Sequence, residues 1–199
     1  MGTSTSNCND LPYNNGLYTG ELQNGKPHGC GKLLWGSVTI APRRAKSTTT
    51  PFIMYQYQYV GGFLNGVFDG NGTYTVYNTV LSTPKRRKVF YTVTGYWHEN
   101  TIGTCTMVDE TGSIHRGQYC DMISENGNIS LNGRIHITYK TGVIVDCTFI
   151  NNHANGIGTI VFNSNEHYSG SIYNDEMYDG IYCKGNTITT YNGGIPTAS

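Results

Sequence analysis

Six copies of a hairpin pattern punctuated by glycine follow one another along this chain of 199 residues. In the first copy Tyr18, Gly20 and Leu22 alternate with polar residues, so they share one face of a strand. Asn24-Gly25 then supplies a two-residue turn, because both residues tolerate positive φ. A pattern that repeats in this way predicts stacked hairpins, with its best-defined residues used for stacking.

The clearest copies begin with a tyrosine followed by regularly spaced glycines, and the later copies are less regular. The first copy contains Tyr18, Gly20, Leu22, Gly25, His28, Gly29, Gly31 and Trp35. The second contains Tyr59, Gly61, Phe63, Gly66, Gly70 and Gly72, with Asp69 in place of His28. The others contain Val93, Gly95, Trp97, Gly103 and Cys105; His115, Gly117, Tyr119, Gly133 and Tyr139; Val145, Cys147, Phe149, Asn152, Gly156, Gly158 and Phe162; and Tyr168 and Gly170.

The composition favours rings lying on bare backbone over a thick aliphatic interior. The chain has 26 glycines and 16 tyrosines, and only 13% of its residues are charged. A glycine without Cβ lets a ring approach the main chain closely. We therefore expect the tyrosine and tryptophan rings of each repeat to rest on glycine backbone of the next.

These residues resemble the MORN (membrane occupation and recognition nexus) repeat family, whose unit has a Tyr-x-Gly start and a His-Gly-x-Gly return. The resemblance spans about residues 18–191 and is strongest in the first copy. It implies an all-β fold: an elongated, single-layer, twisted antiparallel sheet of about six to seven stacked hairpins. The family is implicated in cytoskeletal scaffolds, axonemes and junctions between membrane and cytoskeleton.

Two insertions interrupt the repeats. The starts Tyr18 and Tyr59 lie 41 positions apart, and Tyr59 and Val93 lie 34 apart, against 23 between Val145 and Tyr168. Strand-like flanks predict lengthened hairpin arms, at about residues 36–57 and 78–92. We expect an N-terminal extension at 1–15, the repeat ladder at 16–194 and a C-terminal tail at 195–199.

Basic residues gather at the tips of both arms. Seven of the thirteen lie there: Arg43, Arg44, Lys46, Lys85, Arg86, Arg87 and Lys88. Since both arms leave the same side of successive repeats, the tips should lie about 10 to 20 Å apart. One hypothesis is a dock for tubulin tails, anionic lipid headgroups or a nucleic-acid backbone. The alternative is that these charges keep long exposed strands from aggregating.

Charge is also divided along the chain. Residues 1–98 hold nine basic and three acidic residues, whereas residues 99–199 hold four and ten, giving +6 and −6. Such a dipole can steer head-to-tail contacts or an acidic partner. The alternative is that this distribution of surface charges arose by chance. The decay of the last repeats predicts either a blunted edge or self-association through the C-terminal hairpins.

Cysteine spacing and hydropathy favour the cytosol. No pair among Cys8, Cys30, Cys105, Cys120, Cys147 and Cys183 has C-x-x-C spacing, so reduced structural thiols are expected. No apolar run approaches the ~18 residues of a membrane span, and none follows Met1 as in a signal peptide.

Catalytic patterns are not evident, and we predict no enzyme activity, cofactor or metal. The histidines, His28, His98, His115, His136, His153 and His167, are scattered. The glycines follow hairpin spacing and match no phosphate loop. The preferred hypothesis is a scaffold protein in a cytoskeletal assembly, microtubule-based or axonemal, with tubulin or axonemal subunits as partners. The alternatives are a peripheral membrane module that binds anionic phospholipid, and an aromatic repeat that binds glycans or serves a viral particle.

Overall fold

The computed structural model describes residues 4–40, 53–80, 86–118 and 130–198. These residues form strands joined by turns, and no helix occurs among them. It follows that the described residues contain no helix long and apolar enough to cross a bilayer. The chain divides into a first unit, residues 1–102 with 122–128, and a second unit, residues 103–121 with 129–199.

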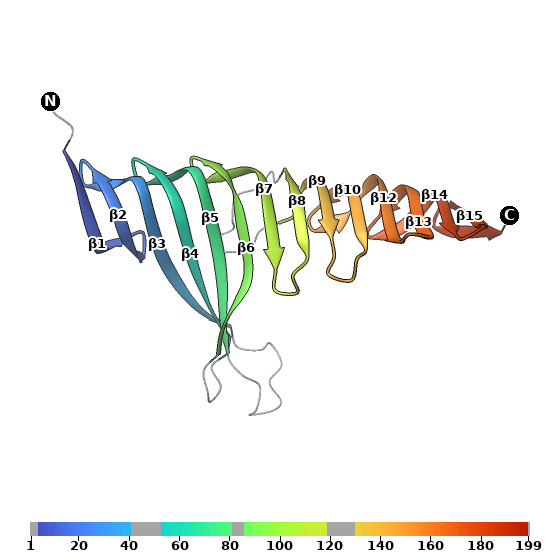
Figure 1. Cartoon of the computed structure of the whole chain (residues 1–199), viewed down its shortest axis with the longest axis horizontal. Helices are drawn as coiled ribbons and strands as arrows, with labels where there is room; N and C mark the ends of the chain where they lie inside the picture. Colours follow the sequence, from blue (N-terminus) through green and yellow to red (C-terminus); the bar gives the residue numbers. More distant parts are fainter. Residues whose placement is uncertain (1–3, 41–52, 81–85, 119–129, 199) are drawn as a thin grey trace. The chain divides into compact units, whose positions relative to one another are not determined.

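The first unit is a sheet of consecutive antiparallel strands, from blue to green in Figure 1. Each strand pairs with the next one in the chain. The strands are β1 (Thr5–Tyr13), β2 (Gly16–Gln23), β3 (Lys26–Ile40), β4 (Ile53–Leu64), β5 (Val67–Val80) and β6 (Arg86–His98). The predicted all-β architecture of stacked antiparallel hairpins is confirmed.

The second unit repeats this topology with shorter strands. Its strands are β7 (Thr101–Asp109, which starts at the unit boundary), β8 (Ile114–Gln118), β9 (Gly133–Thr138), β10 (Ile144–Ile150), β11 (His153–Ala154), β12 (Gly156–Asn163), β13 (Glu166–Tyr173), β14 (Glu176–Lys184), β15 (Thr187–Asn192) and β16 (Ile195–Ala198). Strand β11 pairs with β10 alone, and β10 also pairs with β12. Strand β15 contains the final strand that the sequence predicted at Thr187–Tyr191.

Several hairpins of each unit are closed by two-residue turns in which both residues have positive φ. The angles are 51° and 75° at Asn24-Gly25 and 52° and 95° at Asn65-Gly66. The same geometry recurs at Asn151-Asn152 and Asn174-Asp175 in the second unit. Mirror-image turns of this kind match the right-handed twist of the paired strands, so Asn, Asp and Gly recur there.

Aromatic side chains from successive strands form the core of the first unit. Tyr18, Leu33, Tyr59, Tyr74 and Val93 lie in one register row, and none is more than 4% exposed. The register shifts beyond this row, between Gly61 and Phe63 in the pairing of β4 with β5. The Phe68 ring then stacks on Tyr59 with 3.9 Å between centroids. The curvature of these strands, visible in Figure 1, thus lets one sheet bury its own rings.

A row of glycines crosses the same sheet and receives the tyrosine rings. This glycine row consists of Gly20, Gly31, Gly61, Gly72 and Gly95. A Cβ at Gly31 would lie 2.6 Å from Cζ of Tyr18, and one at Gly72 would lie 2.5 Å from Cζ of Tyr59. A side chain at either glycine would therefore collide with the ring.

The tyrosines differ from the expectation in one respect. Tyr18 and Tyr59 lie on glycines of their own hairpins, because each hydroxyl bonds three residues ahead, to Glu21 O (2.7 Å) and Gly62 O (3.1 Å). The expectation that these rings cover the next repeat was wrong. Trp97 does bridge repeats, since its Nε1 donates to Gly72 O at 3.2 Å.

The paired strands extend further than the sequence analysis placed them. Thr5–Tyr13, within the expected N-terminal extension, forms β1, and Ile195–Ala198, within the expected tail, forms β16. Most side chains of β1 are exposed, so its sequence lacks the alternation that marks a half-buried strand. Pairing with β2, and not hydrophobic patterning, defines this strand.

Candidate functional site

The two arms form one four-stranded extension of the first unit. The ends of β3, β4, β5 and β6 lie in a single register row, with Ile40 opposite Ile53, Ile53 opposite Val80, and Val80 opposite Arg86. Three strand spacings separate the outer members, about 14 Å. Residues 41–52 and 81–85 therefore begin and end on neighbouring strands.

The predicted basic patch lies only partly within the described residues. Arg43, Arg44, Lys46 and Lys85 fall outside them, and Arg86 starts β6. Arg87 and Lys88 are exposed. The Arg87 guanidinium lies 3.7 Å from the centre of the Tyr77 ring, a cation–π contact that restrains it.

The predicted repeat residues occupy strands and turns of both units. Trp35 packs near Tyr57, Phe68 and Tyr74, with centroid distances of 5.7 to 6.0 Å. Tyr168 repeats the hydroxyl contact, to Ser171 O at 2.6 Å. Tyr119 falls outside the described residues. The remaining placements are Gly25 and Gly66 in turns, His28, Gly29 and Gly31 in β3, Phe63 in β4, Gly70 and Gly72 in β5, Gly95 and Trp97 in β6, Gly117 in β8, Phe149 in β10, Gly156, Gly158 and Phe162 in β12, and Gly170 in β13.

The turns bond to neighbouring repeats, a feature that the sequence analysis missed. The Asn100 N–H donates to Phe68 O (3.0 Å), and the Phe68 N–H donates to Asn100 Oδ1 (2.8 Å). Asp175 makes the same pair of bonds with Ala154, at 3.1 and 2.6 Å. We call this two-bond contact the turn clasp. Asn152 forms a third clasp, with Leu131.

The contact between the first and second repeats has only one of the two hydrogen bonds of the clasp, because neither partner has the group needed for the second bond. The Gly66 N–H donates to Pro27 O at 2.8 Å. Pro27 has no N–H to donate, and Gly66 has no side chain to accept it. In the three clasps an Asn or Asp at the second turn position faces a residue that has an N–H, whereas the Gly66 contact has neither group.

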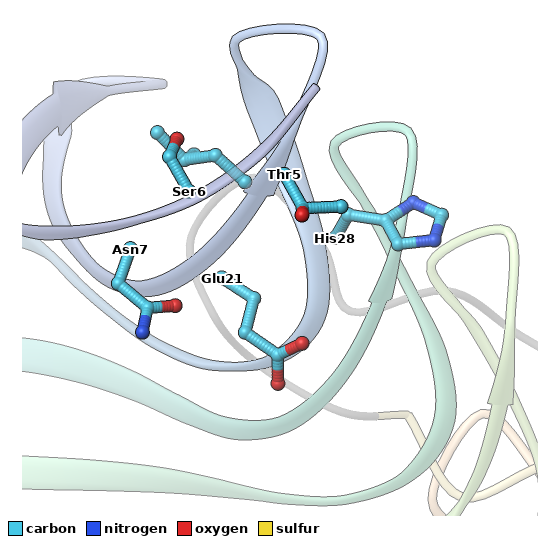
Figure 2. Close-up of a pocket in the computed structure, with 6 residues that line it drawn as sticks. Thr5, Ser6, Asn7, Glu21 and His28 are labelled. Atoms are coloured by element: carbon cyan, nitrogen blue, oxygen red, sulfur yellow. The ribbon is translucent and has the colours of Figure 1, made fainter. Parts of the chain in front are cut away.

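A polar hollow of about 380 Å³ lies at the start of the first unit, lined by residues of β1, β2 and β3. Figure 2 shows Thr5, Ser6 and Asn7 of β1 with Glu21 and His28. The Glu21 carboxylate accepts the Cys30 N–H at 3.0 Å, so it holds the irregular start of β3. His28 Nδ1 is buried without a hydrogen-bond partner. The hollow offers hydrogen-bonding groups, but these two side chains do not form an acid–base pair.

Histidines pair with aspartates at several separate places. His98 and Asp69 are 3.0 Å apart (Nδ1 to Oδ2), and His153 and Asp175 are 2.7 Å apart. His115 is buried beside Asp109, and burial lowers its pKa in spite of that carboxylate. Among the described residues, no three His, Cys, Asp or Glu side chains gather as metal ligands would. These pairs therefore join strands and turns without forming a common centre.

Comparison with known proteins gives one finding on the family. The family model described as MORN repeat matches residues 18–37 and 59–78. A search of curated proteins finds no match. The two matched segments include the Tyr18 and Tyr59 contacts with the glycine row.

Proposed function

Because this chain is a MORN-repeat protein, we propose that it is a non-enzymatic scaffold whose arms dock on an acidic protein surface of a cytoskeletal assembly. MORN repeats indicate a repeat-type module for protein interaction or membrane association. The family is generally structural or binding rather than enzymatic. The cytoskeletal setting, in the cytoplasm or in a ciliary axoneme, is the finer part of the proposal.

The shared register of the arms carries this proposal. Ile40, Ile53, Val80 and Arg86 lie on adjacent strands, so both basic segments leave the sheet from one place. Basic side chains concentrated on a paired scaffold attract acidic segments over about a Debye length. The acidic tails of tubulin have the required charge, and a microtubule-based assembly is therefore the proposed setting.

Burial of the repeat aromatics supports a protein-interaction role over stacking of sugars. Tyr18, Tyr59 and Tyr168 are 0% exposed, so their ring faces are already covered. A sugar-stacking site needs at least one open ring face beside polar groups. The rings of Tyr18 and Tyr59 instead stabilise the sheet from which the arms extend.

Co-sedimentation with stabilised microtubules tests the proposal. The full chain should pellet with intact microtubules and bind protease-trimmed microtubules that lack the acidic tails much more weakly. The double variant Arg86→Glu with Arg87→Glu should bind about tenfold more weakly, since each exposed charge pair contributes up to about 1 kcal/mol. Binding should also weaken steeply with added salt.

A matched control separates the arms from general charge. Lys26→Glu with Lys32→Glu makes the same change in net charge on exposed ladder residues outside the arms. This variant should bind nearly as well as the original chain. Equal loss in both variants, or no binding to microtubules, would refute the proposal. Binding to anionic vesicles without binding to microtubules would replace the protein partner with a lipid headgroup.

A further inference from the structure

Two turns of the first unit have the same sequence and geometry but different surroundings. Asn24-Gly25 and Asn65-Gly66 both have positive φ at both residues, with values within 20° of each other at each position. The Gly66 N–H donates to Pro27 O at 2.8 Å, and Gly66 is buried. Gly25 is exposed, and its N–H has no hydrogen-bond partner among the described residues.

From this difference we infer that Asn24 is a modification site, where the side-chain amide converts spontaneously to aspartate and isoaspartate, and that Asn65 is protected. The Gly25 nitrogen attacks Cγ of Asn24, and a C–N bond forms. The Cγ–Nδ2 bond breaks, and ammonia leaves with the proton from Gly25. Water then opens the five-membered succinimide at either carbonyl, which gives aspartate or isoaspartate.

The hydrogen bond of Gly66 protects Asn65 because the attacking nitrogen must lose its proton. In the folded chain Pro27 O holds that proton, and breaking the bond costs a buried carbonyl its partner. At Gly25 no hydrogen bond to a described residue has to break, and a Cβ placed there would meet no atom within 4 Å. The nitrogen of Gly25 is therefore free to deprotonate and to approach the side chain of Asn24.

The other described Asn-Gly steps lack this freedom. Gly193 N–H donates to Asp179 Oδ1 at 2.8 Å. The remaining glycines of such steps, Gly16, Gly72, Gly133 and Gly156, lie in paired strands. Asn24 is thus the described Asn-Gly step that combines an exposed turn with an unbonded glycine amide.

Conversion at Asn24 should loosen the first strand. The Asn24 N–H donates to Ser4 O at 3.2 Å, next to the start of β1. Isoaspartate inserts a methylene into the main chain between Gln23 and Lys26, which pair across the turn. The hairpin can then no longer keep both its own pairing and the bond to Ser4.

Ageing of the intact chain tests the inference. The folded protein is incubated in mildly alkaline buffer at physiological temperature, and isoaspartate is measured by mass spectrometry in chymotryptic peptides that contain Asn24 or Asn65. Asn24 should convert about tenfold faster, the ratio expected from one hydrogen bond of ordinary strength. Hydrogen exchange at Thr5–Asn7 should become faster in the aged protein.

Two controls tie the difference to the fold. In concentrated denaturant the two rates should become nearly equal, because the Gly66 bond is lost. The Asn24→Gln variant should remove isoaspartate from its own peptide and leave Asn65 unchanged. The inference is overturned if Asn65 converts as fast as Asn24 in the folded protein, or if the ratio persists in denaturant.

Discussion

The second repeat belongs to the first unit and the fifth repeat to the second unit. The two repeats differ at the position of the tyrosine ring and at the position of the first glycine under it. In the second repeat Tyr59 lies on Gly61 and Gly72. In the fifth, Val145 replaces the tyrosine, and Cys147, 0% exposed, replaces the first glycine. The Cys147 thiol donates to Gly156 O at 3.7 Å, so a small side chain fills the space of the missing ring.

This comparison teaches that the ring and the bare backbone form one packing unit. Tyr168 in the second unit supports this, because it keeps both glycines, and its hydroxyl would lie 2.7 Å from a Cβ at Gly170 or Gly180. In the fifth repeat the first glycine is lost together with the ring, whereas Gly158 remains, because a Cβ there would lie 2.5 Å from Asp146 O. The fifth repeat has thus lost the ring and one of its two glycines, and its strands still pair.

The largest effect is expected from a methyl group under a ring. Gly72→Ala places Cβ against Tyr59 and should destabilise the first unit by about 2 to 3 kcal/mol. Urea unfolding measures this loss. Gly103→Ala is the control, since a Cβ there meets no atom within 4 Å.

A double variant extends this test. Tyr59→Val alone should also destabilise, because it removes a buried ring and its hydrogen bond. The double variant Tyr59→Val with Gly72→Ala should lose at least about 1 kcal/mol less stability than the sum of the losses in the two single variants. Simple additivity would show that ring and glycine do not act together.

A smaller effect is expected from the tyrosine hydroxyls. Tyr59→Phe and Tyr168→Phe each remove a bond to a backbone carbonyl and should cost about 1 kcal/mol in their units. Tyr74→Phe should be neutral or slightly stabilising, because the Tyr74 hydroxyl is buried without a partner. Equal losses at all three positions would contradict the role given to the hydroxyl.

The clasp between Asp175 and Ala154 predicts that the stability of the second unit depends on pH. Partial burial raises the pKa of Asp175, but hydrogen bonds from Ala154 and His153 outweigh burial and leave that pKa lowered. The stabilisation is present above the unfolded pKa of about 3.9 and is lost as pH falls through the lower folded value. Asp175→Asn should remove this acid-dependent part of unfolding. An unchanged acid profile would show that the clasp does not depend on the charge.

The smallest effect concerns thiol reactivity and leaves the fold intact. Burial raises the pKa of Cys105 to about 12, and burial also raises the pKa of Cys147. Cys30 is exposed. In mildly alkaline buffer iodoacetamide should label Cys30 in the folded protein and spare Cys105 and Cys147. Rapid labelling of Cys147 would mean that its site opens often.

The sequence predicted the hairpins well, since periodic glycines and Asn-Gly turns are local signals. The pairing of the arms could be predicted from their flanking strands, and the structure pairs Val38 with Tyr55 and Val76 with Tyr91. The sequence did not predict which repeat each tyrosine ring covers, because a ring can reach glycines of its own hairpin or of the next. The Tyr18 ring lies on its own hairpin because its hydroxyl donates to Glu21 O, three residues ahead.

The turn clasp was harder to foresee, because it depends on two residues far apart in the sequence. Asn152 finds Leu131 only after the intervening strands have paired. The basic tips remain a prediction, since Arg43, Arg44, Lys46 and Lys85 lie outside the described residues.

The alignment of the glycine row bears on how such chains can change length over evolution. Gly20, Gly31, Gly61, Gly72 and Gly95 stand side by side, and the register shifts next to them recur at the same level in the hairpins of β2 with β3 and β4 with β5. Deleting one residue within a strand would move every later side chain to the opposite face. Duplicating or losing a whole hairpin would leave the row continuous, so the strands of such chains tolerate the gain or loss of an entire repeat better than that of a single residue.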